Sequence, residues 1–335
     1  MSTAVSVALA RRGLLVAVLV TALPTCMSAR TPEALVSSRA APVTTIEPVE
    51  PHEPEPVEPA VPPSPPPIEL PRGGRTIFPE HRLVGFCGTP GAPALGELQG
   101  DLAAKAKVLE ARASQYGGDG GAGPKILPVF ELIAVIVQAW PGADGKYRRR
   151  VDDSVVREYL RVARLAKAIL LLNVQPGHSD FLTEVKAFEP FLREPDVGLA
   201  LDPEWAMKPN ERPGEFWGQT TASVINSVAD YLASLVVAGD LPEKVLVFHE
   251  VVRKVVKDET SMRAPPGVVI VKSVDGLGPP YAKVATYANL MQRMAPGVHP
   301  GFKLFFYEDT QNGGSLMSAS QVLALSPQPE YVMYE

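Results

Sequence analysis

Eight short apolar runs, separated by amphipathic segments, constrain the fold of this chain more than any other feature. Each run has the length of a β-strand and is almost continuously apolar, which is typical of strands buried on both faces. The runs cover residues 82–88, 125–131, 168–173, 197–202, 244–249, 267–274, 302–307 and 330–334. Segments with helical spacing lie between most of them, at residues 98–114, 153–167, 221–237 and 281–294. A regular alternation of strand and helix predicts a parallel sheet.

The number of these units predicts how the sheet closes. Eight strands in residues 81–335 match a (β/α)8 barrel of the TIM type, which usually has about 250 residues. The alternative is a doubly wound open sheet. A dinucleotide-binding sheet of that kind needs a G-x-G-x-x-G turn after its first strand, and the segment at 88–91, GTPG, does not match this pattern. We therefore expect an α/β domain with a barrel at residues 81–335.

The N-terminus carries a targeting signal. Arg11 and Arg12 precede an apolar run at residues 13–23, which is too short to span a bilayer that needs roughly 20 residues. A run of this length fits the central region of a signal peptide. Cys26 follows in a segment that resembles the lipobox of bacterial lipoproteins, although Thr25 is unusual before the cysteine. We expect residues 1–26 to be a signal peptide with lipidation at Cys26; secretion after cleavage nearby and a retained anchor are the alternatives.

Residues 27–80 form a predicted linker. The stretch at residues 46–71 alternates proline with glutamate and other polar residues. Proline fixes φ and has no backbone N–H, so this stretch cannot form a helix or a central strand. Repulsion between the glutamates favours an extended, polyproline-like chain. We expect the linker to lift the barrel off the outer face of a membrane, or to precede a secreted domain.

Composition excludes several classes of function. The net charge of −5 provides no basic excess of the kind that phosphate backbones attract, so we expect no nucleic-acid partner. The chain has two cysteines and five histidines, and they are scattered rather than spaced as zinc ligands. We expect no metal and no cofactor.

Polar residues follow nearly every apolar run. In barrels of this type, functional side chains lie at the C-terminal ends of the strands. The strand ends of this chain supply Glu131, Asn173, Gln175, Asp202, Glu204, Trp205, His249, Asp275, Lys303, Tyr307 and Tyr334. Any one of them fits a strand that simply ends in water, but together they predict a pocket that binds a ligand or performs chemistry.

Asp202 and Glu204 are the most specific pair. At positions i and i+2 of a strand, their side chains would point the same way, so Asp202 could raise the pKa of Glu204 and keep it protonated. Trp205 beside them could present a flat face to a sugar. The Asp-Pro-Glu order is also a common helix start with proline at the first helical position. Both interpretations remain open from the sequence.

The D-x-E-W pattern at residues 202–205 resembles the strand-four acid motif of chitinase-like and lysozyme-like barrel glycosidases. Such an enzyme needs a second carboxyl group. Glu131 and Asp275 are the candidates, but the sequence does not supply the distances that separate retaining from inverting enzymes. His249 would act as a base or as an orienting donor. Asn173, Gln175, Trp205, Lys303, Tyr307 and Tyr334 would position the substrate.

Short motifs at the predicted strand ends add a family resemblance. They are VGFCGTPG at 84–91, LIA at 132–134, PGADG at 141–145, QPG at 175–177, LALDPE at 199–204, LPEKV at 241–245, DGLG at 275–278 and KLF at 303–305. This set resembles a family of actinobacterial cell-surface lipoproteins with a glycosidase-like barrel of unassigned activity. The chain departs from the family at Cys87, where tyrosine is expected, at Asn173, where aspartate is expected, and after His249. The loss of a carboxylate at Asn173 counts against catalysis.

Two functions are compatible with these observations. The first is a surface-anchored glycoside hydrolase-like barrel that acts on a cell-envelope or extracellular polysaccharide, with Glu204 as general acid. The second is a non-catalytic carbohydrate-binding or cell-wall-associated lipoprotein with the same fold. In both, the partners are a carbohydrate polymer and the membrane that holds the lipid anchor.

Overall fold

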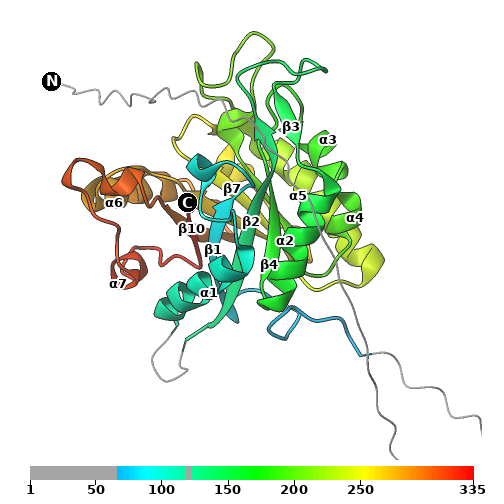
Figure 1. Cartoon of the computed structure of the whole chain (residues 1–335), viewed down its shortest axis with the longest axis vertical. Helices are drawn as coiled ribbons and strands as arrows, with labels where there is room; N and C mark the ends of the chain where they lie inside the picture. Colours follow the sequence, from blue (N-terminus) through cyan, green and yellow to red (C-terminus); the bar gives the residue numbers. More distant parts are fainter. Residues whose placement is uncertain (1–65, 118–122) are drawn as a thin grey trace, which may run out of the picture. The chain divides into compact units, whose positions relative to one another are not determined.

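A closed parallel barrel forms the folded part of the chain (Figure 1). The structure is a computed structural model that describes residues 66–117 and 123–335, and Pro67–Glu335 form one compact unit. The barrel closes because β1 pairs in parallel with both β2 and β11. In order around it, the eight strands are β1 (His81–Gly88), β2 (Lys125–Val137), β4 (Ile169–Val174), β5 (Val197–Leu201), β7 (Lys244–Glu250), β9 (Val268–Val274), β10 (Val298–Leu304) and β11 (Tyr331–Tyr334). This closure confirms the predicted (β/α)8 fold over the open sheet.

Helices cover the outside of the barrel. They are α1 (Leu102–Ala113), α2 (Asp153–Leu165), α3 (Phe181–Lys186), α4 (Glu189–Leu192), α5 (Ala222–Gly239), α6 (Pro280–Met291) and α7 (Ala319–Leu323). The side chain of Thr221 accepts a hydrogen bond from the backbone N–H of Val224 and caps α5, as a threonine before a helix is expected to do. By length and composition α5 could cross a membrane, but its apolar residues pack against β7 and β9.

A short hairpin extends the barrel beyond its C-terminal end. β2 continues past its neighbours to Val137, and β3 (Arg148–Arg150) pairs with it antiparallel. The buried carboxylate of Glu184 on α3 binds Arg148 at 2.8 Å and Arg150 at 2.7 Å. The loop between β2 and β3 therefore stands above the barrel mouth on a fixed base.

The seventh strand lies earlier in the chain than its apolar run predicts. The run covers residues 302–307, whereas β10 is Val298–Leu304. The carboxylate of Asp309 accepts from the backbone N–H of Phe305 at 2.9 Å, so the chain turns away just after the strand. As a consequence Lys303 lies within β10, while Tyr307 lies in the loop after it and is exposed.

The compact unit begins before the predicted barrel domain. Residues 67–80 belong to the predicted linker, yet Leu70 and Ile77 are buried in the core. The backbone N–H of Ile77 donates to Glu243 at 2.7 Å, and Arg75 donates to the carbonyl of Leu241 at 3.0 Å. These contacts hold the segment to the start of β7. The predicted signal peptide, with Cys26, and most of the linker lie outside the described residues.

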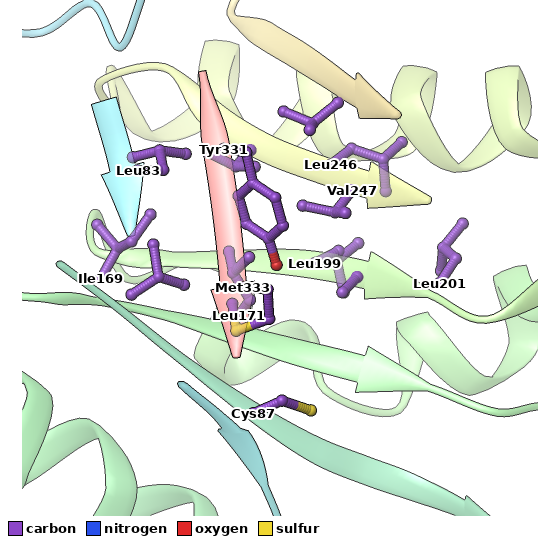
Figure 2. Packing of buried hydrophobic residues seen from close by; sticks show 14 of the residues in the cluster. Leu83, Cys87, Ile169, Leu171, Leu199, Leu201, Leu246, Val247, Tyr331 and Met333 are labelled. Carbon is purple, nitrogen blue, oxygen red and sulfur yellow. The ribbon is translucent and has the colours of Figure 1, made fainter. Parts of the chain in front are cut away.

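Apolar side chains fill the barrel interior. Figure 2 shows Leu171, Leu199, Tyr331 and Met333 among the buried residues between the strands. A Cβ on Gly85 would lie 2.6 Å from Met333 Cε, so this glycine makes room for the methionine. Such close packing makes the lower interior a solid core rather than a pore.

Candidate functional site

A layer of polar side chains replaces the apolar core at the C-terminal end of the barrel. Alternate residues of a strand share a face, so the inward positions of β2 continue from Val129 to Glu131. By the same alternation Tyr331 points into the barrel from β11, as Figure 2 shows. Glu131, Asn173 and His249 are completely buried, and Lys303 is nearly so. The structure therefore brings these four predicted site residues together.

His249 lies between two carboxylates. Its Nδ1 atom is 3.0 and 2.9 Å from the two carboxylate oxygens of Asp275, and its Nε2 atom is 3.1 Å from Glu131 Oε1. Ser273 Oγ donates to Asp275 Oδ1 at 2.8 Å. Lys303 adds a second cation, 3.2 Å from Asp275 and 2.5 Å from Glu335. Cations and carboxylates thus alternate through the centre of the layer.

This alternation keeps the buried groups charged. Burial lowers the pKa of His249, but the carboxylates of Asp275 and Glu131 raise it well above its ordinary value. Burial raises the pKa of Glu131, but His249, Lys303 and Tyr331 outweigh burial and lower it to about 2. The pKa of Asp275 is also lowered, because His249 and Lys303 outweigh its burial. At neutral pH the histidine is therefore a cation between two anions.

Every oxygen of Glu131 is engaged. Oε1 accepts from Asn173 Nδ2 at 2.9 Å and from Cys87 Sγ at 3.6 Å, and Oε2 accepts from the hydroxyl of Tyr331 at 2.5 Å. Burial and the neighbouring Glu131 raise the pKa of the Cys87 thiol, so it stays protonated. Glu131 therefore holds the side chains of Asn173, Cys87 and Tyr331 in place.

Asp202 follows β5 and takes two amide donors. Asn173 Nδ2 donates to Oδ1 at 3.0 Å, and Gln175 Nε2 donates to Oδ2 at 3.0 Å. The side-chain oxygen of Gln175 in turn accepts from the backbone N–H of Val137 at 3.0 Å. Burial raises the pKa of Asp202, and His249, Lys303 and Gln175 oppose this rise. The side-chain amides of Asn173 and Gln175 therefore fix the position of the Asp202 carboxylate.

Glu204 has a free carboxyl oxygen. It lies in a 3-10 turn, Pro203–Trp205, so the chain adopts the helical start that Asp-Pro-Glu also predicted, but for a single turn. Its side chain is 7% exposed, and within the described residues Oε2 has no hydrogen-bond partner. Burial, followed by the charges of Asp202 and Asp275, raises the pKa of Glu204 well above its ordinary value. Glu204 is therefore the carboxyl group of the site whose environment most favours the protonated form.

The remaining predicted residues lie apart from this layer. Trp205 is half-buried beside Glu204, and Tyr307 is exposed on the loop after β10. Tyr334 faces outward from the barrel, where its hydroxyl lies 2.5 Å from that of Tyr116 and the guanidinium of Arg112 covers its ring. A direct contact with a ligand inside the barrel is therefore incompatible with the position of Tyr334.

Three residues that bind side chains of the polar layer were not predicted as site residues from the sequence. Ser273 and Tyr331 bind the two carboxylates that flank His249, and Glu335 binds Lys303. The signal that could have found them is the alternation of strand residues, because Ser273 is two positions before Asp275 and Tyr331 is four before Glu335.

Two further ion clusters tie the loops and helices to the barrel wall. Lys272 on β9 is buried and lies 2.6 Å from Glu250, in contact with Glu259, and 2.7 Å from the carbonyl of Leu290. Lys283 on α6 binds Asp309 at 2.9 Å. In the described part of the chain, no group of three or more histidine, cysteine or acidic side chains is arranged to hold a metal ion.

Comparisons with known proteins identify no family for this chain. No protein-family model matches the chain, and no curated protein matches it. Among solved structures, the chain is similar to the crystal structure of a GH18 chitinase from Pseudoalteromonas aurantia, with 12% identity and a TM-score of 0.34. The match covers 76% of this chain and 93% of that chain. The fold assignment rests on the strand pairing rather than on this similarity.

Proposed function

We propose that this protein is a surface-anchored glycoside hydrolase-like barrel that acts on a cell-envelope or extracellular polysaccharide, with Glu204 as its general acid. One observation carries the proposal: the buried carboxyl group of Glu204 has a free oxygen, and burial together with the charges of Asp202 and Asp275 raises its pKa well above the ordinary value. Glycosidases need two carboxyl groups whose pKa values differ, one to donate a proton and one to act as nucleophile or base.

The other residues take supporting roles in this proposal. Asp202 raises the pKa of Glu204 by like charge, and Asp275 does so to a smaller extent. We assign Asp275, rather than Glu131, as the second carboxylate of the pair, because the charge of Asp275 is among those that raise the pKa of Glu204. Asn173 and Gln175 bind Asp202, and Trp205 follows Glu204 in the chain; in this proposal the three residues position the sugar.

A second candidate function is supported by the burial of the site. Glu131 and His249 are completely buried, and the polar layer is closed by its own hydrogen bonds and ion pairs. Such a layer suits a stable, non-catalytic scaffold that binds carbohydrate at its rim. Under this alternative the protein is a cell-wall-associated lipoprotein.

The location at the cell surface is part of the same proposal. It is supported by the apolar run that ends near Cys26 and by the proline-rich stretch that follows. Metabolic labelling with an alkyne fatty acid should label the wild-type chain and not Cys26→Ser. Equal labelling of both would reject the lipid anchor.

Hydrolysis tests the main proposal. The compact unit, residues 67–335, should release reducing ends from one member of a panel of cell-wall and plant polysaccharides. Glu204→Gln should abolish this release, while Glu215→Gln, which changes an exposed carboxylate on the same loop, should not. No release from any polymer, together with saturable binding to one of them, would favour the non-catalytic function.

A further inference from the structure

The exposed aromatic side chains gather at one end of the barrel. Within the described residues, four aromatic side chains are largely exposed: Trp140 at 61%, Phe216 at 54%, Tyr281 at 79% and Tyr307 at 70%. They lie after β2, after β5, at the start of α6 after β9, and after β10. Each therefore follows the C-terminal end of a barrel strand, the end that carries Glu204. We call these four residues the aromatic rim.

The order of the strands places the rim on opposite sides of the mouth. β2 is the second strand around the barrel and β9 the sixth of eight, so the loops that carry Trp140 and Tyr281 start from diametrically opposite strands. Trp140 follows the extension of β2 that pairs with β3, and this hairpin rises above the other strands. In Figure 1 the loops beside β3 project beyond the barrel end, away from α1.

The chemistry of the rim indicates a carbohydrate. Single exposed apolar residues are common, but a set gathered at one end of the barrel marks a binding surface. The most exposed aliphatic side chains, Leu165 and Val237, lie instead near the C-terminal ends of α2 and α5. Flat aromatic faces match the apolar C–H faces of sugar rings. The free carboxyl oxygen of Glu204 lies at the same end of the barrel.

We propose that the aromatic rim binds an extended polysaccharide, which crosses the barrel mouth with sugar units on both sides of Glu204. The position of Glu204 in the middle of the bound chain rests on the proposed function; the rim itself does not. A ligand that reaches both Trp140 and Tyr281 must contain several sugar units. The chain is therefore held internally, and a hydrolase of this geometry cleaves within the polymer rather than at its ends.

Affinity electrophoresis tests the rim separately from hydrolysis. The full chain carrying Glu204→Gln is run in native gels that contain hydroxyethyl cellulose, glucomannan, laminarin or glycol chitin. At least one polymer should retard it. Trp140→Ala and Tyr281→Ala should each weaken this retention by about fivefold or more, the usual effect of removing an aromatic anchor, and the double variant should lose it. Leu165→Ala and Val237→Ala are the matched controls and should behave like the parent.

Calorimetry with oligosaccharides of the retained polymer adds the length requirement. A hexasaccharide should bind at least about tenfold more tightly than a disaccharide, because only the longer chain reaches both sides of the mouth. Three results would refute the proposal that the aromatic rim binds a polysaccharide. They are no retention by any of the four polymers, unchanged retention of the double variant, and equal affinity for the two oligosaccharides. The proposal would also be refuted if sedimentation velocity showed that the parent protein self-associates and that the rim variants only abolish this association. Retention without hydrolysis by the wild-type chain would reject the hydrolase alone.

Discussion

The hydroxyl of Tyr331 should contribute measurably to stability through one hydrogen bond. It donates to Glu131 Oε2 at 2.5 Å, and both side chains are completely buried. A hydrogen bond to a charged group contributes about 1.5–3 kcal/mol, and a buried charged oxygen left without a donor adds to the loss, so we expect Tyr331→Phe to cost about 2–3 kcal/mol. Tyr334→Phe is the matched control. Its hydroxyl is also buried but bonds the neutral hydroxyl of Tyr116, so its removal should cost about 1 kcal/mol.

The pH dependence of this cost follows from the pKa of Glu131. That pKa is about 2 in the folded protein, where His249, Lys303 and Tyr331 outweigh burial, and it lies below the value of about 4.3 for an unfolded chain. A carboxyl group with a lowered pKa stabilises the fold above its unfolded value and loses this contribution as pH falls toward its folded value. The cost of Tyr331→Phe should therefore be complete at neutral pH and should decrease between about pH 4 and pH 2.

Equilibrium urea unfolding of residues 67–335 measures these quantities. Tryptophan fluorescence and circular dichroism should report the same transition, which justifies a single free energy of unfolding. The reasoning is refuted if Tyr331→Phe costs no more than Tyr334→Phe at pH 7. It is also refuted if the cost of Tyr331→Phe is the same at pH 3 as at pH 7, because Glu131 would then not be the group that the hydroxyl stabilises.

Three further predictions concern packing, ionisation and catalysis. Gly85→Ala places a Cβ 2.6 Å from Met333 Cε inside the barrel and should cost about 1–3 kcal/mol or more in urea unfolding, whereas Gly117→Ala, with no atom closer than 3.5 Å, should be nearly neutral. Lys272→Met leaves two buried carboxylates without their cation and should cost about 3–5 kcal/mol at pH 8. That cost should be smaller at pH 6, because burial raises the pKa of Glu250 to about 7; an equal cost at both pH values would contradict this. Asp202→Asn should lower the pKa of Glu204 and move the alkaline limb of any hydrolysis to lower pH, because the general acid works only while protonated; an unmoved limb would reject Asp202 as its modulator.

The strands were predictable because burial on both faces leaves a direct trace in the sequence. Seven of the eight apolar runs lie on the observed strands nearly in register, whereas the run at 302–307 is displaced. Its last three residues, 305–307, lie beyond the strand, and the turn there depends on a hydrogen bond from the backbone N–H of Phe305 to the side chain of Asp309, four residues later. The short helices α3 and α4 were also missed, since one turn of helix carries too few residues for a clear period.

The polar layer was predictable only in part, because a strand end does not say which way a side chain points. Glu131, Asn173 and His249 were found from their positions after apolar runs, and they do meet. Tyr334 was chosen for the same reason, but it faces outward, whereas Tyr331 on the same strand points to Glu131. A shift of one residue in register exchanges the two faces of a strand, and only the closed barrel defines that register.

The contacts of Asn173 in the structure change the interpretation that the sequence suggests. As a replacement for an expected aspartate, it looks like the loss of a catalytic carboxylate. In the structure its amide donates to Glu131 and to Asp202 at the same time, at 2.9 and 3.0 Å. A carboxylate in its place would add a third negative charge and remove both donors, which would raise the pKa values of its neighbours. The two hydrogen bonds of Asn173 therefore favour the charged forms of Glu131 and Asp202, and the charge of Asp202 in turn raises the pKa of Glu204. An asparagine at position 173 is therefore compatible with a general acid at Glu204.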